Sequence, residues 1–138
     1  MSGIAFTTDS TVYESFPTDA DFSAGRGRAV LATATDMDYA TTDQDSATGI
    51  LPANVKDWSS EPNRTGLAVQ SVVVFGPCAA RAGGTITAVG PQTGGVKVEV
   101  TTARLVTANT GEECVGYAME TAADGEFFRM FVQRYTLP

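Results

Sequence analysis

The residue types that most often carry out chemistry are sparse in this chain. It has no histidine, which excludes Ser-His-Asp and Cys-His nucleophile systems and removes the commonest general base at neutral pH. The two cysteines, Cys78 and Cys114, are too few for a four-thiolate zinc site. No GxxxxGK[ST] loop is present, and Gly25 and Gly27 lack the third glycine of a GxGxxG motif. The sequence therefore does not support nucleotide-dependent chemistry, and we expect no cofactor and no catalysis.

Acidic residues are more numerous, and two groups of them were tested as sites. The stretch from Asp36 to Asp45 has the oxygen ligands that calcium prefers, but Ala40 and Thr41 stand where an EF-hand loop has a ligand and a glycine. We interpret it as a solvated acidic loop. A pair of carboxyl groups can hydrolyse glycosides if one is buried. The candidates lie at turns and are read as surface charges: Glu112, Glu113, Glu120 and Glu126.

The charge balance limits the partners of the protein. The net charge is −7 and the isoelectric point is about 4.4, so phosphate backbones repel the chain and direct nucleic-acid binding is disfavoured. No apolar run approaches the roughly 20 residues that span a bilayer, and the start MSGIAFTTDS is no secretory signal. We expect a protein made in a cytoplasm, without membrane contact, whose two cysteines are small buried apolar residues rather than a disulfide.

The second half of the chain predicts β-structure. Val96, Val98 and Val100 alternate with polar residues, which is typical of a half-buried strand. Gly76-Pro77 is expected to end the strand before it, and Asn109-Thr110-Gly111 and Asp124-Gly125 are expected to form turns. Residues 104–107 either continue the strand at 96–100 or begin another. The predicted strands are 29–35, 67–75, 84–89, 96–100, 115–119 and 127–135. The strand at 67–75, which ends at Phe75, is apolar enough throughout to be central. Val115, Tyr117 and Met119 are expected to share a face of the strand at 115–119.

The last predicted strand is apolar on both faces. Phe128, Met130 and Val132 point one way and are expected to meet the core. The other face needs a second cover, which the N-terminal segment or another subunit could supply. The candidates for a subunit interface are therefore Phe127, Phe131 and Tyr135.

The first half of the chain lacks clear periodicity. Aromatic residues are spaced through otherwise polar sequence, which suits an extended arm with aromatic anchors, although these rings could equally pack on their own domain. The candidates for docking are Phe6, Tyr13, Phe16 and Phe22. We predict an all-β fold, a small β-barrel or sandwich with an extended N-terminal arm and a long loop. Its parts are the arm at 1–28, a strand plus long polar loop at 29–66, and a β-domain at 67–138.

One stretch near the C-terminus resembles a known family. Phage capsid decoration proteins, also called cement proteins, have a stretch "G-x-A-x-E-x-A-x-x-G-E" that leads into a final apolar strand. Here the pattern falls on Gly116, Ala118, Glu120, Ala122, Gly125 and Glu126. The stretch CAARAGGTITAVG at 78–90 is similar to their strand entry.

The resemblance implies a small, non-enzymatic β-barrel or sandwich, often trimeric, on the outer capsid surface of the virion. The expected partners are the major capsid protein and the chain itself, as a homotrimer. The function would be to stabilise an assembled phage head by bridging capsid subunits. The alternative is a receptor- or carbohydrate-binding virion appendage, a fibre or lectin-like module, for which Trp58 with Tyr39 is the candidate aromatic site.

Overall fold

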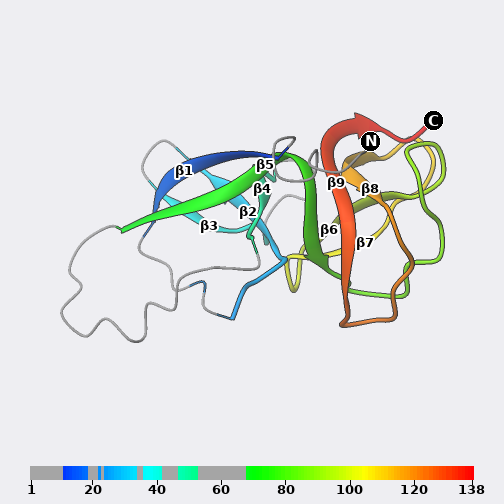
Figure 1. The fold of residues 1–138 in the computed structure, drawn as a ribbon, viewed down its shortest axis with the longest axis horizontal. Coiled ribbons are helices and arrows are strands. Elements are labelled where there is room, and N and C mark those ends of the chain that lie inside the picture. The colour runs from blue at the N-terminus through cyan, green and yellow to red at the C-terminus, as the bar shows by residue number, and fades with distance from the viewer. Residues whose placement is uncertain (1–10, 19–21, 23, 34–35, 42–46, 53–67) are drawn as a thin grey trace, which may run out of the picture.

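The computed structural model describes residues 11–18, 22, 24–33, 36–41, 47–52 and 68–138, and these residues form an all-β fold (Figure 1). No helix occurs among them, and all the strand pairs are antiparallel, which confirms the expected fold class. The strands are β1 (Val12–Thr18), β2 (Ala29–Ala32), β3 (Met37–Tyr39), β4 (Gly49–Ile50), β5 (Ala68–Arg81), β6 (Gly95–Glu99), β7 (Arg104–Thr107), β8 (Glu113–Ala118) and β9 (Phe127–Thr136).

The long strand β5 belongs to both halves of the molecule. Its first part pairs with β1, over the register from Val12↔Phe75 to Thr18↔Ala68, and with β4. Its last part pairs with β9, from Gly76↔Val132 to Arg81↔Phe127. The strand order is β3-β2-β4-β5-β9-β8-β6-β7, with β1 beside β5. Figure 1 shows β5 bending as it passes from the N-terminal lobe (β1–β4 with residues 68–75) into the C-terminal half-barrel (residues 76–81 with β6–β9).

The bend in β5 lies at Gly76-Pro77, where the sequence predicted that the strand would end. Gly76 has a φ of 105°, a conformation that side chains disfavour, and it turns the strand without breaking its pairing to β9. Pro77 lacks an N–H donor, but the pairing of β1 with β5 ends at Phe75, so no strand in the described part of the chain is paired with Pro77 on that side. The prediction that Gly76-Pro77 ends the strand is therefore wrong.

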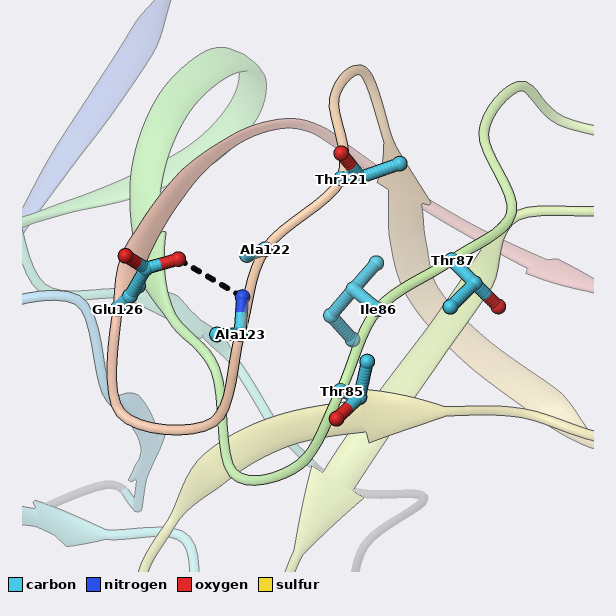
Figure 2. Close-up of a pocket in the computed structure, with 7 residues that line it drawn as sticks. All are labelled: Thr85, Ile86, Thr87, Thr121, Ala122, Ala123 and Glu126. Carbon is cyan, nitrogen blue, oxygen red and sulfur yellow. Dashed lines mark hydrogen bonds between the residues drawn. The ribbon is translucent and has the colours of Figure 1, made fainter.

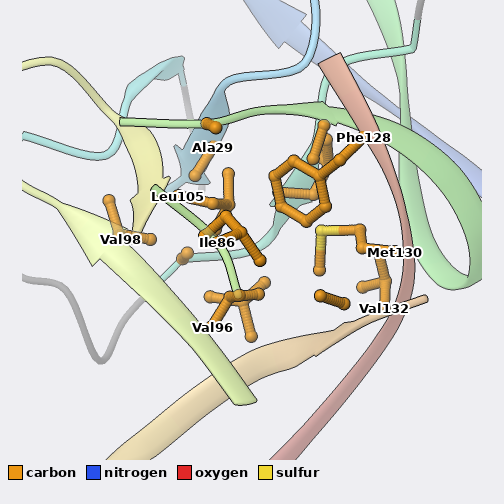
Figure 3. Packing of buried hydrophobic residues seen from close by; sticks show 14 of the residues in the cluster. Ala29, Ile86, Val96, Val98, Leu105, Phe128, Met130 and Val132 are labelled. Atoms are coloured by element: carbon orange, nitrogen blue, oxygen red, sulfur yellow. The ribbon is translucent and has the colours of Figure 1, made fainter. Parts of the chain in front are cut away.

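The C-terminal half-barrel curls around the main core. Ala82 and Leu105 form a parallel bridge, and the Gly83 amide donates to the Leu105 carbonyl at 2.7 Å, so the start of β7 lies beside the end of β5. Side chains from β6, β7 and β9 fill the inside (Figure 3). The face predicted for β9 is confirmed, since Phe128, Met130 and Val132 are all buried. Ala29 from β2 packs in the same cluster and joins the two halves.

The N-terminal lobe has a core of its own. Phe22, Val30, Met37, Leu51 and Val72 are buried together. Thr18 at the end of β1 donates its hydroxyl to the Met37 carbonyl at 2.6 Å, which ties β1 to β3. The part of the predicted arm that the structure describes is therefore built into the fold, because a strand with seven register pairs and a buried phenylalanine stabilise the lobe.

Three other local predictions were wrong. Residues 84–89 are not a strand, and only Ile86 bridges, to Ala122. Val100 is exposed because β6 ends at Glu99, whose carboxylate accepts the amide hydrogens of Thr101 and Thr102 and fixes a turn. Val115, Tyr117 and Met119 do not share a buried face, since a register shift between Cys114 and Gly116 interrupts the alternation of β8. Residues 104–107 begin a separate strand, β7.

Candidate docking surface

The ionisable groups with shifted pKa values have structural roles, and none of the shifts is one that a catalytic group needs. Burial raises the pKa of Cys78 to about 12 and also raises the pKa of Cys114, so neither thiol is an activated nucleophile. Hydrogen bonds from the Thr101 backbone and the Thr102 hydroxyl lower the pKa of Glu99. The hydrogen bond from Lys97, at 2.6 Å, and one from the Asn109 amide lower the pKa of Glu112. A lowered pKa is the opposite of what a general acid needs.

The described part of the chain contains neither a metal-binding cluster nor a membrane-spanning helix. No group of three or more His, Cys, Asp or Glu residues lies together there, and no described helix could cross a membrane. Asp36 and Asp38 from the expected acidic loop line a small hollow of about 210 Å³ beside Tyr39. The other aspartates of that loop lie outside the described residues.

A row of apolar side chains crosses the outside of four neighbouring strands. Val12 of β1 is the register partner of Phe75 of β5. The ring of Phe75 meets that of Phe131 of β9 edge to face, with centroids 5.2 Å apart. Phe131 then stacks on Tyr117 of β8, with centroids 5.5 Å apart and planes 10° apart. We call Val12, Phe75, Phe131 and Tyr117 the aromatic row; it lies over the bend of β5.

The aromatic row presents apolar surface to the outside. Val12 and Phe75 are 47% and 43% exposed, and Tyr13, next to Val12, is 55% exposed. Val69, which pairs with Pro17 near the other end of the β1–β5 ribbon, is 68% exposed. Isolated exposed apolar residues are ordinary, but an array of four on two paired strands is typical of an interaction surface. The described residues thus supply a candidate docking surface formed by the aromatic row with Tyr13 and Val69.

The docking candidates named from the sequence have different positions. Phe6 lies outside the described residues. Tyr13 is exposed and adjoins the aromatic row. Phe16 is partly buried against the core of the N-terminal lobe. Phe22 has no exposed surface and meets Tyr39 edge to face at 5.1 Å, so its assignment to docking is corrected: its ring is part of the core.

The interface candidates on β9 are partly covered within the protomer. Phe131 lies between Phe75 and Tyr117 and is only partly exposed. Tyr135 is also partly exposed and meets Tyr117 at 6.4 Å. Phe127 is 46% exposed, and the Arg81 guanidinium lies 4.7 Å from the centre of its ring. The second face of β9 is thus covered in part by side chains that the sequence did not associate with it.

The residues that sequence reasoning missed are Phe75, Tyr117 and Val12. Phe75 was placed in a continuous apolar strand with no assigned outer face, and Tyr117 was placed on the same face as Val115. The register shift in β8 falls at Gly116, and a glycine inside a strand is a signal for such a bulge, but alternation alone could not orient Tyr117. Val12 could be recognised as part of the aromatic row only through its pairing with Phe75 of β5, which is more than 60 residues away in the sequence.

A second hollow, of about 510 Å³, opens between residues 85–87 and the loop before β9 (Figure 2). Ile86 and Ala122 exchange two backbone hydrogen bonds across its floor. Glu126 accepts the Ala123 amide at 2.8 Å, as the dashed line in Figure 2 shows. Hydroxyl groups complete the lining, from Thr85, Thr87 and Thr121. The hollow has polar groups but no aromatic ring for a sugar to stack on.

Comparison with known proteins gives a fold but no family. No protein-family model matches the sequence, and no curated protein matches it either. Among solved structures, the chain is similar to the head fiber gp8.5 N base of bacteriophage phi29, with a TM-score of 0.59 and 15% sequence identity. The similarity covers 93% of this chain and 98% of that one. The two chains therefore share an all-β fold over almost their whole length.

Proposed function

We propose that this protein is a structural component of a phage virion that binds the outer surface of the assembled head. The observation that carries the proposal is the likeness in fold, over nearly the full length of both chains, to a protein described as a head fibre base. The resemblance of residues 116–126 to capsid decoration proteins is an independent line of support, since it rests on sequence. In this proposal the partner is the major capsid protein, and the chain acts as a homo-oligomer, a trimer.

The exposed apolar surface supports a binding role of this kind. The aromatic row with Tyr13 and Val69 extends across both halves of the molecule, because β5 runs through both. Burying such side chains gains roughly 25 cal/mol for each square ångström of apolar area removed from water. A protein that contacts two capsid subunits at once binds the closed shell more tightly than either subunit alone, and so stabilises the shell by mass action.

Binding to heads tests the proposal directly. Heads that lack the protein would be mixed with purified protein and sedimented, and the bound fraction measured over a range of concentrations. The variant Tyr13→Ser with Phe75→Ser should bind at least about tenfold more weakly, since it removes two exposed rings from the docking surface. Heads that carry the wild type should release DNA at a higher temperature than bare heads.

The control is Val100→Ser. Val100 is 37% exposed, close to the 43% of Phe75, and it lies in the turn between β6 and β7, at the opposite end of β6 from Gly95, the register partner of Tyr117. It should bind as the wild type does. Equal binding by all three proteins would argue against the docking surface, and no binding by the wild type would overturn the proposed function.

A second candidate function is a receptor- or carbohydrate-binding appendage, and two observations favour it. The similar structure is described as part of a head fibre, and the Figure 2 hollow offers three hydroxyl groups and a carboxylate. Of the aromatic pair suggested by the sequence, Tyr39 is partly buried beneath Arg28, and Trp58 lies outside the described residues. Binding on a glycan array, lost on Thr87→Val with Thr121→Val, would favour this role over head stabilisation.

A further inference from the structure

Two arginines lie side by side on the outside of the C-terminal half-barrel. Ala82 and Leu105 form a parallel bridge, and both of their side chains are buried in the core. The residues that precede them, Arg81 and Arg104, therefore point outward from neighbouring segments, which lie roughly 4.8 Å apart. Gly83 confirms the close approach, because a Cβ atom placed there would be 3.0 Å from the Cβ of Arg104.

Neither arginine has an anionic partner among the described residues. The Nε atom of each is buried and has no hydrogen-bond acceptor, and no carboxylate in the described part of the chain pairs with either guanidinium. A guanidinium has five donors, and a buried donor without an acceptor costs free energy. Two like charges on adjacent segments repel each other as well. The two guanidinium groups therefore lie side by side without a carboxylate partner in the described part of the chain, although together they could bind one.

An exposed aromatic ring completes the patch. Phe127 is the register partner of Arg81 on β9, and the Arg81 guanidinium lies over its ring. Arginine and aromatic residues are enriched at the centres of protein interfaces, where few other charged residues occur. We call Arg81, Arg104 and Phe127 the arginine patch.

An acidic loop borders the arginine patch. The Gly125 amide donates to the Ala82 carbonyl at 3.0 Å, and the Ala82 amide donates to the Glu126 carbonyl at 2.8 Å, so the loop before β9 lies next to Arg81 in the fold. The side chains of Asp124 and Glu126 on this loop are exposed. A surface on which a positive patch borders a negative one is complementary to a second copy of itself under symmetry.

We propose that the arginine patch binds the acidic loop of a second copy of this chain, with Asp124 and Glu126 of one protomer reaching Arg81 and Arg104 of another. The contact supplies an anionic partner that neither guanidinium has within the described part of the chain. It also offsets part of the repulsion between chains that each carry a net charge of −7. The inference rests on the proposed self-association and requires no contact with a phage head, so the two proposals can fail separately.

Charge reversal on each side of the contact gives the test. Sedimentation equilibrium would measure self-association of the full chain for the wild type, for Arg81→Glu with Arg104→Glu, and for Asp124→Lys with Glu126→Lys. Each double variant should raise the dissociation constant at least about tenfold, because it places like charges opposite each other. An equimolar mixture of the two variants should associate more tightly than either variant alone, since contacts between unlike variants restore opposite charges with their positions exchanged.

The control is Arg134→Glu, which makes the same charge change at an exposed position near the other end of β9 from Phe127 and should associate as the wild type does. Far-UV circular dichroism and thermal melting would show that each variant is folded, and Arg81→Gln with Arg104→Gln replaces the glutamate variant if that one unfolds. A monomeric wild type at tens of micromolar, variants that associate as the wild type does, or a mixture that stays dissociated would each overturn the proposal.

Discussion

The ring of Phe131 lies flat against the ring of Tyr117, with their centroids 5.5 Å apart and their planes 10° apart. The two residues are register partners on β9 and β8, and Phe75 of β5 meets the other side of Phe131. Because Phe75 sits at the bend of β5, this stack fixes the N-terminal lobe to the outer face of the half-barrel. The contact thus has a structural role in addition to its place in the docking surface.

Replacing Phe131 should therefore destabilise the fold. Phe→Ala in a core costs about 3–5 kcal/mol, and since this ring is partly exposed we expect about 2 kcal/mol for Phe131→Ala. Phe127→Ala on the same strand is the control: it removes a more exposed ring and one contact with Arg81, and should cost about 1 kcal/mol or less. Urea unfolding measures both. Equal effects of the two variants would mean that the stack contributes nothing of its own.

Gly116 should tolerate no side chain. A Cβ atom at this position would be 2.0 Å from the carbonyl oxygen of Phe131 on the paired strand, which cannot move without breaking the β8–β9 pairing. We expect Gly116→Ala to destabilise by about 3 kcal/mol. At Gly84 the nearest atom would be 3.8 Å away, so Gly84→Ala should be neutral or stabilise by about 0.5 kcal/mol. Thermal melting of the two variants checks the contrast.

Stability should fall in acid, in part through Glu112. Its folded-state pKa is lowered from 4.5 by Lys97 and the Asn109 amide, so the unfolded chain binds its proton first as the pH falls. The stability that Glu112 contributes is complete above pH 4.5 and is lost as the pH falls through the lowered pKa. Glu112→Gln should reduce the slope of unfolding free energy against pH in this range.

Lys97→Gln tests the same pair from the other side, since it removes the cation that lowers the pKa of Glu112 and leaves the carboxyl group in place. It should also reduce the slope. If Glu112→Gln has the same acid dependence as the wild type, the Lys97–Glu112 pair does not stabilise the fold.

Tyr135 should make the protein sensitive to alkali. Its hydroxyl is buried beside the Cys114 thiol, a weak hydrogen-bond partner, and has no other partner among the described residues. Burial raises its pKa from 10 to about 12, so the folded state keeps this proton between those values while the unfolded state loses it. Stability present below pH 10 is therefore lost as the pH rises toward 12.

The variant Tyr135→Phe separates this hydroxyl from the rest of the alkaline response. It removes a buried polar group without a strong partner, so it should stabilise the protein by up to about 1 kcal/mol at pH 7. It should also reduce the loss of stability above pH 10. A lower melting temperature at pH 7 would show that the hydroxyl makes a useful hydrogen bond in solution.

The sequence predicted best those features that depend on neighbours along the chain. Val96 and Val98 are buried as their alternation indicated, and Gly111 and Gly125 have the positive φ values expected of the turn residues there. Features that depend on distant pairing were not accessible. Phe22 was assigned to an arm because nothing near it in sequence shows that Val72, 50 residues away, lies against it.

In the candidate docking surface, too, the features set by nearby residues were predicted and those set by distant pairing were not. Tyr13 was recognised as an exposed aromatic, and Phe131 was recognised as facing away from the core. Phe75 and Val12 were not connected with them, because only the register of β1 on β5 and of β5 on β9 brings the four side chains together. The arginine patch was missed for a similar reason, since it forms where β7 returns to the end of β5.

The shared strand β5 also has a mechanical consequence. A pull on the N-terminal lobe reaches the half-barrel through one covalent strand, and it loads the ladder from Gly76↔Val132 to Arg81↔Phe127 along the strand direction. Hydrogen bonds loaded in shear share the force and must yield together, whereas bonds peeled from one end yield singly. The molecule should therefore resist a pull along β5 better than a pull across it.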